Sequence, residues 1–219
     1  MRYLWSVISA LYLSKIRGYY RLQRFLDNVT VQLIPASVYA STKKLNLGSS
    51  NRPIPNYINV DVLEERNPDI VCDVSRLDFA SSDEFDLVRA SHILEHFYAE
   101  EAPRILAEWR RVLKTGGYLV LCVPNWQAIA WRTILRPSEY DLEEATDKPR
   151  WINGIFALDL PPEFRHKVIF TKRSLSKLLT ESGFQVVGVL NYRKEHPFAL
   201  GIEDDSCNAF SLNLVAVKR

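Results

Sequence analysis

Short apolar segments alternate with stretches of helical periodicity along most of the chain. Apolar runs of this length, bounded by turn residues, predict buried strands. Their alternation with helices is typical of βαβ units around a parallel sheet. The pattern therefore predicts an α/β fold. The expected strands are 43–47, 57–60, 70–72, 85–88, 118–123, 184–190 and 209–217.

Two helices are predicted from apolar residues that recur at helical spacing. The first carries Pro103 in its first turn, where proline is tolerated, and we expect it to end at Gly116-Gly117. The second has Thr171 as its N-cap and ends at Gly183. The apolar face of the first helix comprises Ala102, Ile105, Leu106, Trp109, Val112 and Leu113.

Residues 1–40 are expected to form a basic, amphipathic helical segment, because apolar residues recur at helical spacing from 4 to 26 with basic residues between them. Two roles remain open for it. It is either a lid across the domain or a membrane-surface helix, with Trp5 in the interface and Arg17 facing anionic lipid. No apolar run is long enough for a spanning helix, and no signal-peptide cleavage site follows the first one.

The main domain is expected to span 41–219, with 126–167 as an insertion. This stretch contains Trp131, Trp151, several prolines and an acidic run, and it has no clear periodicity. A long irregular insertion in a compact domain is more often a lid or binding loop than a linker. We therefore expect it to contribute to a binding site.

Composition narrows the function classes. With 219 residues, 47% hydrophobic and 25% charged, the chain is typical of one globular domain, and a net charge of +2 gives no support to nucleic-acid binding. The three cysteines are far apart, so neither a disulfide framework nor a cysteine metal site is predicted, and we assign no metal ligands. Free thiols are typical of a reducing compartment, and we expect a cytoplasmic protein.

Candidate chemistry lies at the ends of the expected strands, because an open α/β sheet binds its ligand beyond the carboxyl ends of its strands. A small-residue turn, 46–51, follows the first strand and allows a ligand to approach the backbone closely. Asp61 follows the second strand and is suited to accept hydrogen bonds from ribose hydroxyls, and Asp73 follows the third. Each aspartate is also a common turn residue, so a purely structural role stays open.

Four motifs between Leu45 and Asn125 resemble the class I S-adenosylmethionine-dependent methyltransferases, and most closely the bacterial methyltransferase-type-11 branch. Their order along the chain is that of the family, which makes the resemblance more specific than one glycine motif. The motifs are Leu45-Asn46-Leu47-Gly48-Ser49, Asn59-Val60-Asp61, Ser91-His92-Ile93-Leu94-Glu95-His96 and Arg111-Val112-Leu113-Lys114-Thr115-Gly116-Gly117.

The resemblance implies a Rossmann-like three-layer sandwich with a mostly parallel seven-stranded sheet and an antiparallel last strand. It implies that Gly48 faces the methionine part of S-adenosylmethionine, Asp61 the ribose, and Asp73 with Val74 the adenine. The cofactor-binding residues expected from it are Asn46, Gly48, Ser49, Ser50, Asp61, Asp73, Val74, Ser91 and His92.

The chain departs from the family's pattern in the first turn. Ser50 stands where a second glycine is usual, and Asn46 stands where an acid is commoner. The connection 47–57 holds two prolines and is too short for a full crossover helix, so we expect a loop or a single turn there.

Methyl transfer needs alignment of donor and acceptor, and it needs a base when the acceptor is a hydroxyl. His96 is the first candidate for this base, followed by His92 and His166, because histidine titrates near neutral pH. A helix-capping role for Glu95 and His96 stays open. Relatives of the resembling branch often accompany polysaccharide synthesis, which favours O-methylation of a sugar, polysaccharide or glycolipid.

Two other functions are considered. A catalytically silent methyltransferase-like domain that binds or scaffolds a partner is favoured by the reduced glycine turn. A dinucleotide-dependent oxidoreductase is disfavoured, because Gly48-Ser49-Ser50 lacks the glycine spacing that seats a pyrophosphate at a helix terminus.

Overall fold

The computed structural model describes residues 34–135, 156–157, 160–189 and 211–219. They form a seven-stranded sheet with strand order β3-β2-β1-β4-β5-β7-β6, in which β7 is antiparallel to both β5 and β6 and the other pairs are parallel. The α/β fold with an antiparallel last strand is confirmed. The strands are β1 Lys44–Leu47, β2 Ile58–Asp61, β3 Ile70–Val71, β4 Phe85–Ser91, β5 Leu113–Pro124, β6 Phe184–Val189 and β7 Ser211–Lys218.

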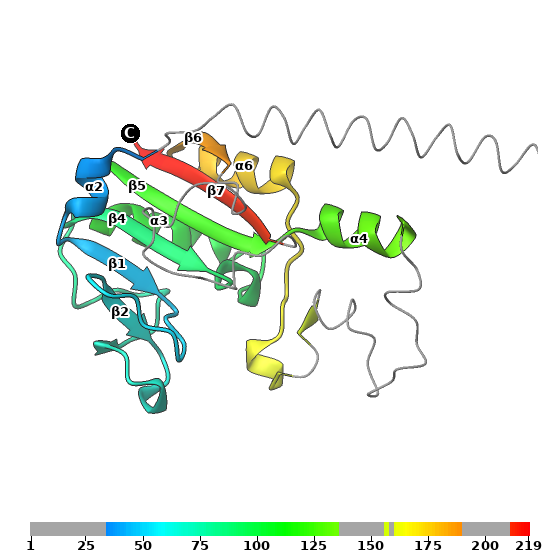
Figure 1. Ribbon diagram of the computed structural model, residues 1–219, viewed down its shortest axis with the longest axis horizontal. Coiled ribbons are helices and arrows are strands. Elements are labelled where there is room, and N and C mark those ends of the chain that lie inside the picture. Colours follow the sequence, from blue (N-terminus) through cyan, green and yellow to red (C-terminus); the bar gives the residue numbers. More distant parts are fainter. Residues whose placement is uncertain (1–33, 136–155, 158–159, 190–210) are drawn as a thin grey trace, which may run out of the picture.

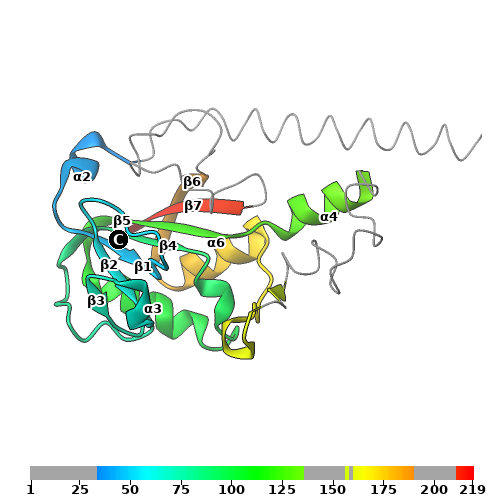
Figure 2. The ribbon, with the colours of Figure 1, turned by 60° about the horizontal axis from the view of Figure 1, so that its bottom comes forward.

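Helices lie on both faces of the sheet (Figures 1 and 2). Helices α3 and α6 cover one face, and the short α2 lies on the opposite one. The α-helices are α2 Ala36–Ala40, α3 Ala102–Val112, α4 Trp126–Leu135 and α6 Lys172–Glu181, and the 3-10 turns are η1 Glu64–Arg66, η2 Leu94–His96 and η4 Pro162–Phe164.

Strand residues alternate between two buried layers, because successive side chains in a strand point to opposite faces. In β4, Val88 and Ala90 pack in the layer shared with α3 and α6, whereas Leu87 packs in the opposite layer. Ile54 and Tyr57, from the connection between β1 and β2, fill part of that second layer. The expected loop at 47–57 is confirmed, and its apolar side chains cover the face that a crossover helix would otherwise cover.

Helix α6 agrees with its sequence signals. The Thr171 side chain accepts a hydrogen bond from the Ser174 amide, and the Ser174 hydroxyl in turn accepts one from the Thr171 amide, which completes a capping box. Gly183 follows the helix with a φ of +83°, a conformation that glycine adopts without steric cost.

Two helix predictions require correction. Helix α3 ends at Val112, before the expected end at Gly116-Gly117, because Leu113 already pairs with Phe85 at the start of β5. Helix α4 lies inside the stretch that was expected to be irregular. Its apolar residues are distributed all around the helix, so the sequence shows no amphipathic stripe there.

The predicted amphipathic segment 1–40 lies outside the described residues up to position 33, as does the part of the insertion at 136–155. The division into 1–40 and 41–219 therefore stays a prediction. Among the residues that are described, no helix has the length and apolar character needed to cross a bilayer.

Helix α3 holds the loop that follows β3. The Trp109 indole is fully buried and donates to the Val74 carbonyl at 2.8 Å. The Glu108 carboxylate accepts from the Leu77 amide at 2.8 Å, and Arg111 donates to both the Glu108 carboxylate and the Leu77 carbonyl. Three side chains of one helix therefore fix the position of the backbone directly after Asp73.

We expect this loop to loosen in acid. The hydrogen bond from Arg111 holds the pKa of the Glu108 carboxyl below its ordinary value of 4.5, against the opposing effect of burial. A lowered folded-state pKa stabilises the fold above the unfolded value, and this stabilisation is lost as the pH falls through the folded value. Glu108→Gln should lower the urea midpoint at pH 7, and its difference from the wild type should shrink below about pH 4.5.

Glu181→Gln is the matched control, because Glu181 forms an exposed pair with Lys177 at 3.7 Å, and such pairs contribute little to stability. A Glu108→Gln effect that stays constant down to pH 3 would contradict a role for the carboxylate charge.

Candidate functional site

The carboxyl ends of β1, β2 and β4 meet at one edge of the sheet, because β1 pairs in parallel with both neighbours. The turn after β1 places Gly48 at a φ of +65°. A β-carbon added at Gly48 would lie 1.9 Å from Cδ1 of Ile93, which belongs to the segment after β4. The glycine turn and the 91–96 motif are therefore in direct contact.

Asp61 is 2% exposed and ends β2 beside this turn. Its carboxylate accepts hydrogen bonds from the Ser50 amide at 2.7 Å and from the Leu63 amide at 3.0 Å. The Arg66 guanidinium lies 3.3 and 3.4 Å from its two oxygens. A ribose diol that used this carboxylate would take the place of Arg66.

Asn46 lies beneath the turn and is fully buried. Its amide nitrogen donates to Asn59 at 3.0 Å, and its amide oxygen accepts from Arg89 at 2.8 Å. These bonds tie β1 to β2 and β4 and give Asn46 a structural function, so its contact with a cofactor stays a prediction. Ser49 is 4% exposed, and its buried hydroxyl has no hydrogen-bond partner among the described residues.

The loop after β3 presents the expected adenine residues. Asp73 is exposed, and one of its oxygens accepts from the Ser75 amide at 2.8 Å, which closes the turn. Val74 is buried at 8% exposure. The turn role of Asp73 is thus present, and one carboxylate oxygen can serve both the turn and a ligand.

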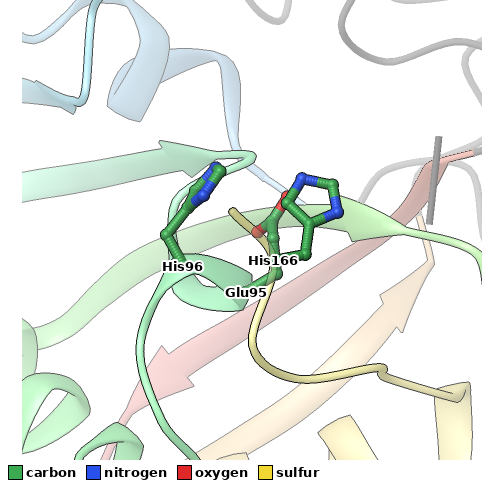
Figure 3. A group of neighbouring side chains, drawn as sticks. All are labelled: Glu95, His96 and His166. Carbon is green, nitrogen blue, oxygen red and sulfur yellow. The ribbon is translucent and has the colours of Figure 1, made fainter. Parts of the chain in front are cut away.

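Three histidines surround one buried carboxylate after β4. Glu95 has no exposed surface, and its Oε1 lies 3.0 Å from His92 Nδ1 and 3.9 Å from His166 Nε2. The rings of His96 and His166 are 4.8 Å apart between centroids, in an edge-to-face arrangement. Figure 3 shows the Glu95 carboxylate beside the His166 ring, with the His96 ring close by.

Backbone contacts bring His166 to this cluster across a long sequence separation. The amides of Lys167 and Val168 donate to the Glu95 carbonyl at 2.7 and 3.3 Å, and the His166 amide donates to the Phe156 carbonyl at 3.1 Å. The structure therefore places all three predicted catalytic histidines in one cluster. Ser91, which is 8% exposed, ends β4 directly before it.

Several residues of this edge were not predicted from the sequence. For Glu95 the sequence suggested only a possible helix-capping role, although its position between His92 and His96 in the motif was an available signal. Nothing in the sequence indicated that Arg66 contacts Asp61 or that the Ile93 side chain packs on Gly48. Ser211 lies 119 residues from His92, yet its hydroxyl is 3.0 Å from His92 Nε2, a contact that only the tertiary fold creates.

Residues 52–121 match a family model described as "Methyltransferase domain". The chain carries a methyltransferase domain. This match, together with the S-adenosylmethionine-dependent methyltransferases among the solved structures of similar fold, supports S-adenosylmethionine as the cofactor. No curated protein sequence matches the chain.

Solved structures of similar fold come from diverse organisms. A methyltransferase from Methanosarcina mazei is 22% identical with a TM-score of 0.51, covering 80% of this chain and 91% of its own. One from Archaeoglobus fulgidus is 15% identical with a TM-score of 0.52, covering 91% and 92%. One from Mesorhizobium loti is 17% identical with a TM-score of 0.50, covering 80% and 90%. All three are described as S-adenosylmethionine-dependent, and at these identities they show the fold.

The contact between Gly48 and Ile93 gives a prediction about stability. Gly48→Ala should cost about 1–2 kcal/mol for the left-handed backbone, plus about 1–3 kcal/mol for overpacking against Ile93. Gly116→Ala is the control, because Gly116 has a φ of +79° with no atom within 4 Å of an added β-carbon. Urea denaturation should show a larger loss of unfolding free energy for Gly48→Ala than for Gly116→Ala. In a background that already carries Ile93→Ala, the loss caused by Gly48→Ala should be smaller. Equal losses in the two single variants would show that Ile93 does not press on the turn.

Proposed function

We propose that this domain transfers a methyl group to a hydroxyl oxygen of a sugar, polysaccharide or glycolipid. The observation that carries the proposal is the cluster of His92, Glu95, His96 and His166 beside the glycine turn. A hydroxyl acceptor must lose a proton during methylation, and imidazole and carboxylate groups are suited to bind and activate it. The preference for a sugar comes from the resemblance of the sequence motifs.

The residues of the sheet edge fit the cofactor. S-adenosylmethionine supplies an electrophilic methyl group on a sulfonium when it is bound. We assign Asp61 to its ribose hydroxyls, since the Ser50 and Leu63 amides already orient this carboxylate. Gly48 and Ser49 are assigned to the methionine part, and Asp73 with Val74 to the adenine. The buried Ser49 hydroxyl gains a partner if the ligand reaches the turn.

The acceptor is assigned to the histidine cluster. Gly48 and Ile93 are in contact, so a methionine group at the turn lies next to the segment that carries His92 and His96. His96 is our first candidate to act on the acceptor, because its Nδ1 is buried without a hydrogen-bond partner among the described residues. His92 is bonded to both Glu95 and Ser211, which suits a positioning role.

An acceptor made at the membrane would suit the amino-terminal sequence. The basic amphipathic pattern of residues 1–40 favours contact with an anionic lipid surface from the cytoplasmic side. The alternative role for this segment is a lid over the cofactor.

A second candidate is a catalytically silent domain that binds a partner. Two contacts favour it: Arg66 occupies the carboxylate of Asp61, and the Ile93 side chain packs on Gly48. In both places a side chain of the protein lies where a cofactor group is expected.

Cofactor binding distinguishes the two candidates. Calorimetric titration should show micromolar binding of S-adenosylmethionine and S-adenosylhomocysteine, with no binding of NADH. Asp61→Asn should weaken binding about tenfold or more, because hydrogen bonds to a charged acceptor contribute about 1.5–3 kcal/mol. Asp78→Asn is the matched control, since Asp78 pairs with Arg76 on the surface at 2.7 Å.

Arg66→Met tests the same carboxylate from the other side of the pair. It removes the guanidinium that competes for Asp61 and should leave the affinity for S-adenosylmethionine unchanged or raise it. Failure of both sulfur ligands to bind the folded wild-type protein would favour the silent domain, and loss of binding in Arg66→Met would contradict the assignment of Asp61 to the ribose.

Acceptor class is tested by methyl transfer from radiolabelled S-adenosylmethionine to a panel of glycolipids, oligosaccharides and small amines. We expect the label on an oxygen of a sugar, found as an O-methyl sugar after acid hydrolysis, and lost in His96→Gln. Label transferred to amines alone would contradict O-methylation.

A further inference from the structure

We propose that Glu95, His96 and His166 bind a divalent transition-metal cation such as Zn²⁺. One donor atom from each of the three residues lies within 4.8 Å of the other two. Two imidazoles and one carboxylate form a donor set that suits Zn²⁺ and the neighbouring first-row cations better than Mg²⁺ or Ca²⁺, which prefer oxygen ligands. The sequence alone gave no sign of this site, because its third ligand is distant in the chain.

The burial of unpaired atoms in this cluster supports the proposal. Oε2 of Glu95 and Nδ1 of His96 are both buried, and neither has a hydrogen-bond partner among the described residues. A buried carboxylate oxygen without a partner is costly, and buried polar atoms in proteins are rarely left so. A cation placed between these atoms satisfies both. Figure 3 shows the three side chains gathered at one place, from the turn after β4 and from the segment before α6.

The donor atoms lie farther apart than in an assembled zinc site, with separations of up to 4.8 Å. Bonds of about 2.0–2.2 Å in a tetrahedral zinc site put neighbouring ligand atoms about 3.3–3.5 Å apart. Glu95 Oε1 and His166 Nε2 are separated by 3.9 Å. Binding of the cation therefore requires the donor atoms to approach one another, by about half an ångström for this pair and by up to about 1.5 Å for a pair at the 4.8 Å limit.

Neighbouring side chains orient the proposed metal ligands through hydrogen bonds. His92 Nδ1 lies 3.0 Å from Oε1 of Glu95, and His92 Nε2 lies 3.0 Å from the Ser211 hydroxyl. Ligating carboxylates in metal sites are commonly oriented by such hydrogen bonds. Lys167 does not compete for the site, because its ammonium donates to the carbonyls of His96 and Glu163 and lies 5.3 Å from the centre of the Tyr98 ring.

Three protein ligands leave at least one coordination position open, as in catalytic zinc sites. This inference deepens the proposed function. It rests on that function only for the group that fills the open coordination position, which is the acceptor hydroxyl. Its coordination favours release of its proton to water, its oxygen then bonds to the methyl carbon, and the carbon–sulfur bond breaks with its electron pair returning to sulfur. His96 is then a metal ligand, and it is the cation that activates the hydroxyl.

Calorimetry on the full chain, freed of metal by a chelator and dialysed, tests the site with Zn²⁺ alone. We expect one ion per chain at micromolar or tighter affinity. His166→Gln and Glu95→Gln should each weaken binding about 100-fold or more, since outer-shell changes alone cost about 10–100-fold. Cys72→Ser is the control for adventitious thiol binding and should leave the stoichiometry and affinity unchanged. Bound Co²⁺ should give a visible absorption spectrum that the His166→Gln variant lacks.

Thermal unfolding without metal shows whether each variant is folded, and Zn²⁺ should raise the midpoint of the wild type and of Cys72→Ser only. No binding by the wild type, or equal binding by His166→Gln, overturns the metal site. Zinc binding that fails to support methyl transfer to any hydroxyl acceptor leaves the site in place and contradicts the proposed acceptor. Methyl transfer to a sugar that persists in excess chelator retains the proposed function and overturns the role of the cation in activating the acceptor.

Discussion

Parallel pairing of β1 with both β2 and β4 is the constraint on which the candidate site depends. It brings three strand ends to one edge of the sheet, so residues 48–50, Asp61 and the 91–96 motif become neighbours. The pairing is reinforced by polar contacts inside the sheet, where Asn46 bonds to Asn59 on one side and to Arg89 on the other. Buried hydrogen bonds of this kind fix strand register, because leaving any one of their partners unpaired is costly.

The edge is already closely packed by the protein's own side chains. Arg66 pairs with Asp61, and its guanidinium lies 6.0 Å from the centre of the Phe164 ring, which comes from the segment just before His166. Ile93 packs on the glycine turn. A ribose that bonded to Asp61 would displace Arg66, and this movement would change the contacts of both Asp61 and the segment that carries Phe164 and His166. If the domain is active, the free energy of cofactor binding must exceed the free-energy cost of moving Arg66. If the domain is silent, it does not.

Much of the fold could be predicted because its signals are local. Apolar runs located the seven strands, and Thr171 and Gly183 marked the ends of α6. The errors occurred where tertiary contacts override local pattern: Leu113 has the spacing of a helix residue but pairs with Phe85. For the candidate site, strand-end position pointed to Asp61 and the 91–96 motif to His92 and His96, whereas His166 comes from a separate segment before α6. The partners that define their chemistry, Arg66 and Ser211, come from elsewhere in the chain and become visible only in three dimensions.

The most direct test of the account is a crystal structure of the protein with S-adenosylhomocysteine. We predict that both ribose hydroxyls bond to Asp61, that Arg66 moves away from this carboxylate, and that the sulfur faces the segment carrying His92 and His96. A ligand bound elsewhere, or a structure in which Arg66 stays on Asp61 with the ligand present, would contradict the assignment of this edge as the methyl-transfer site.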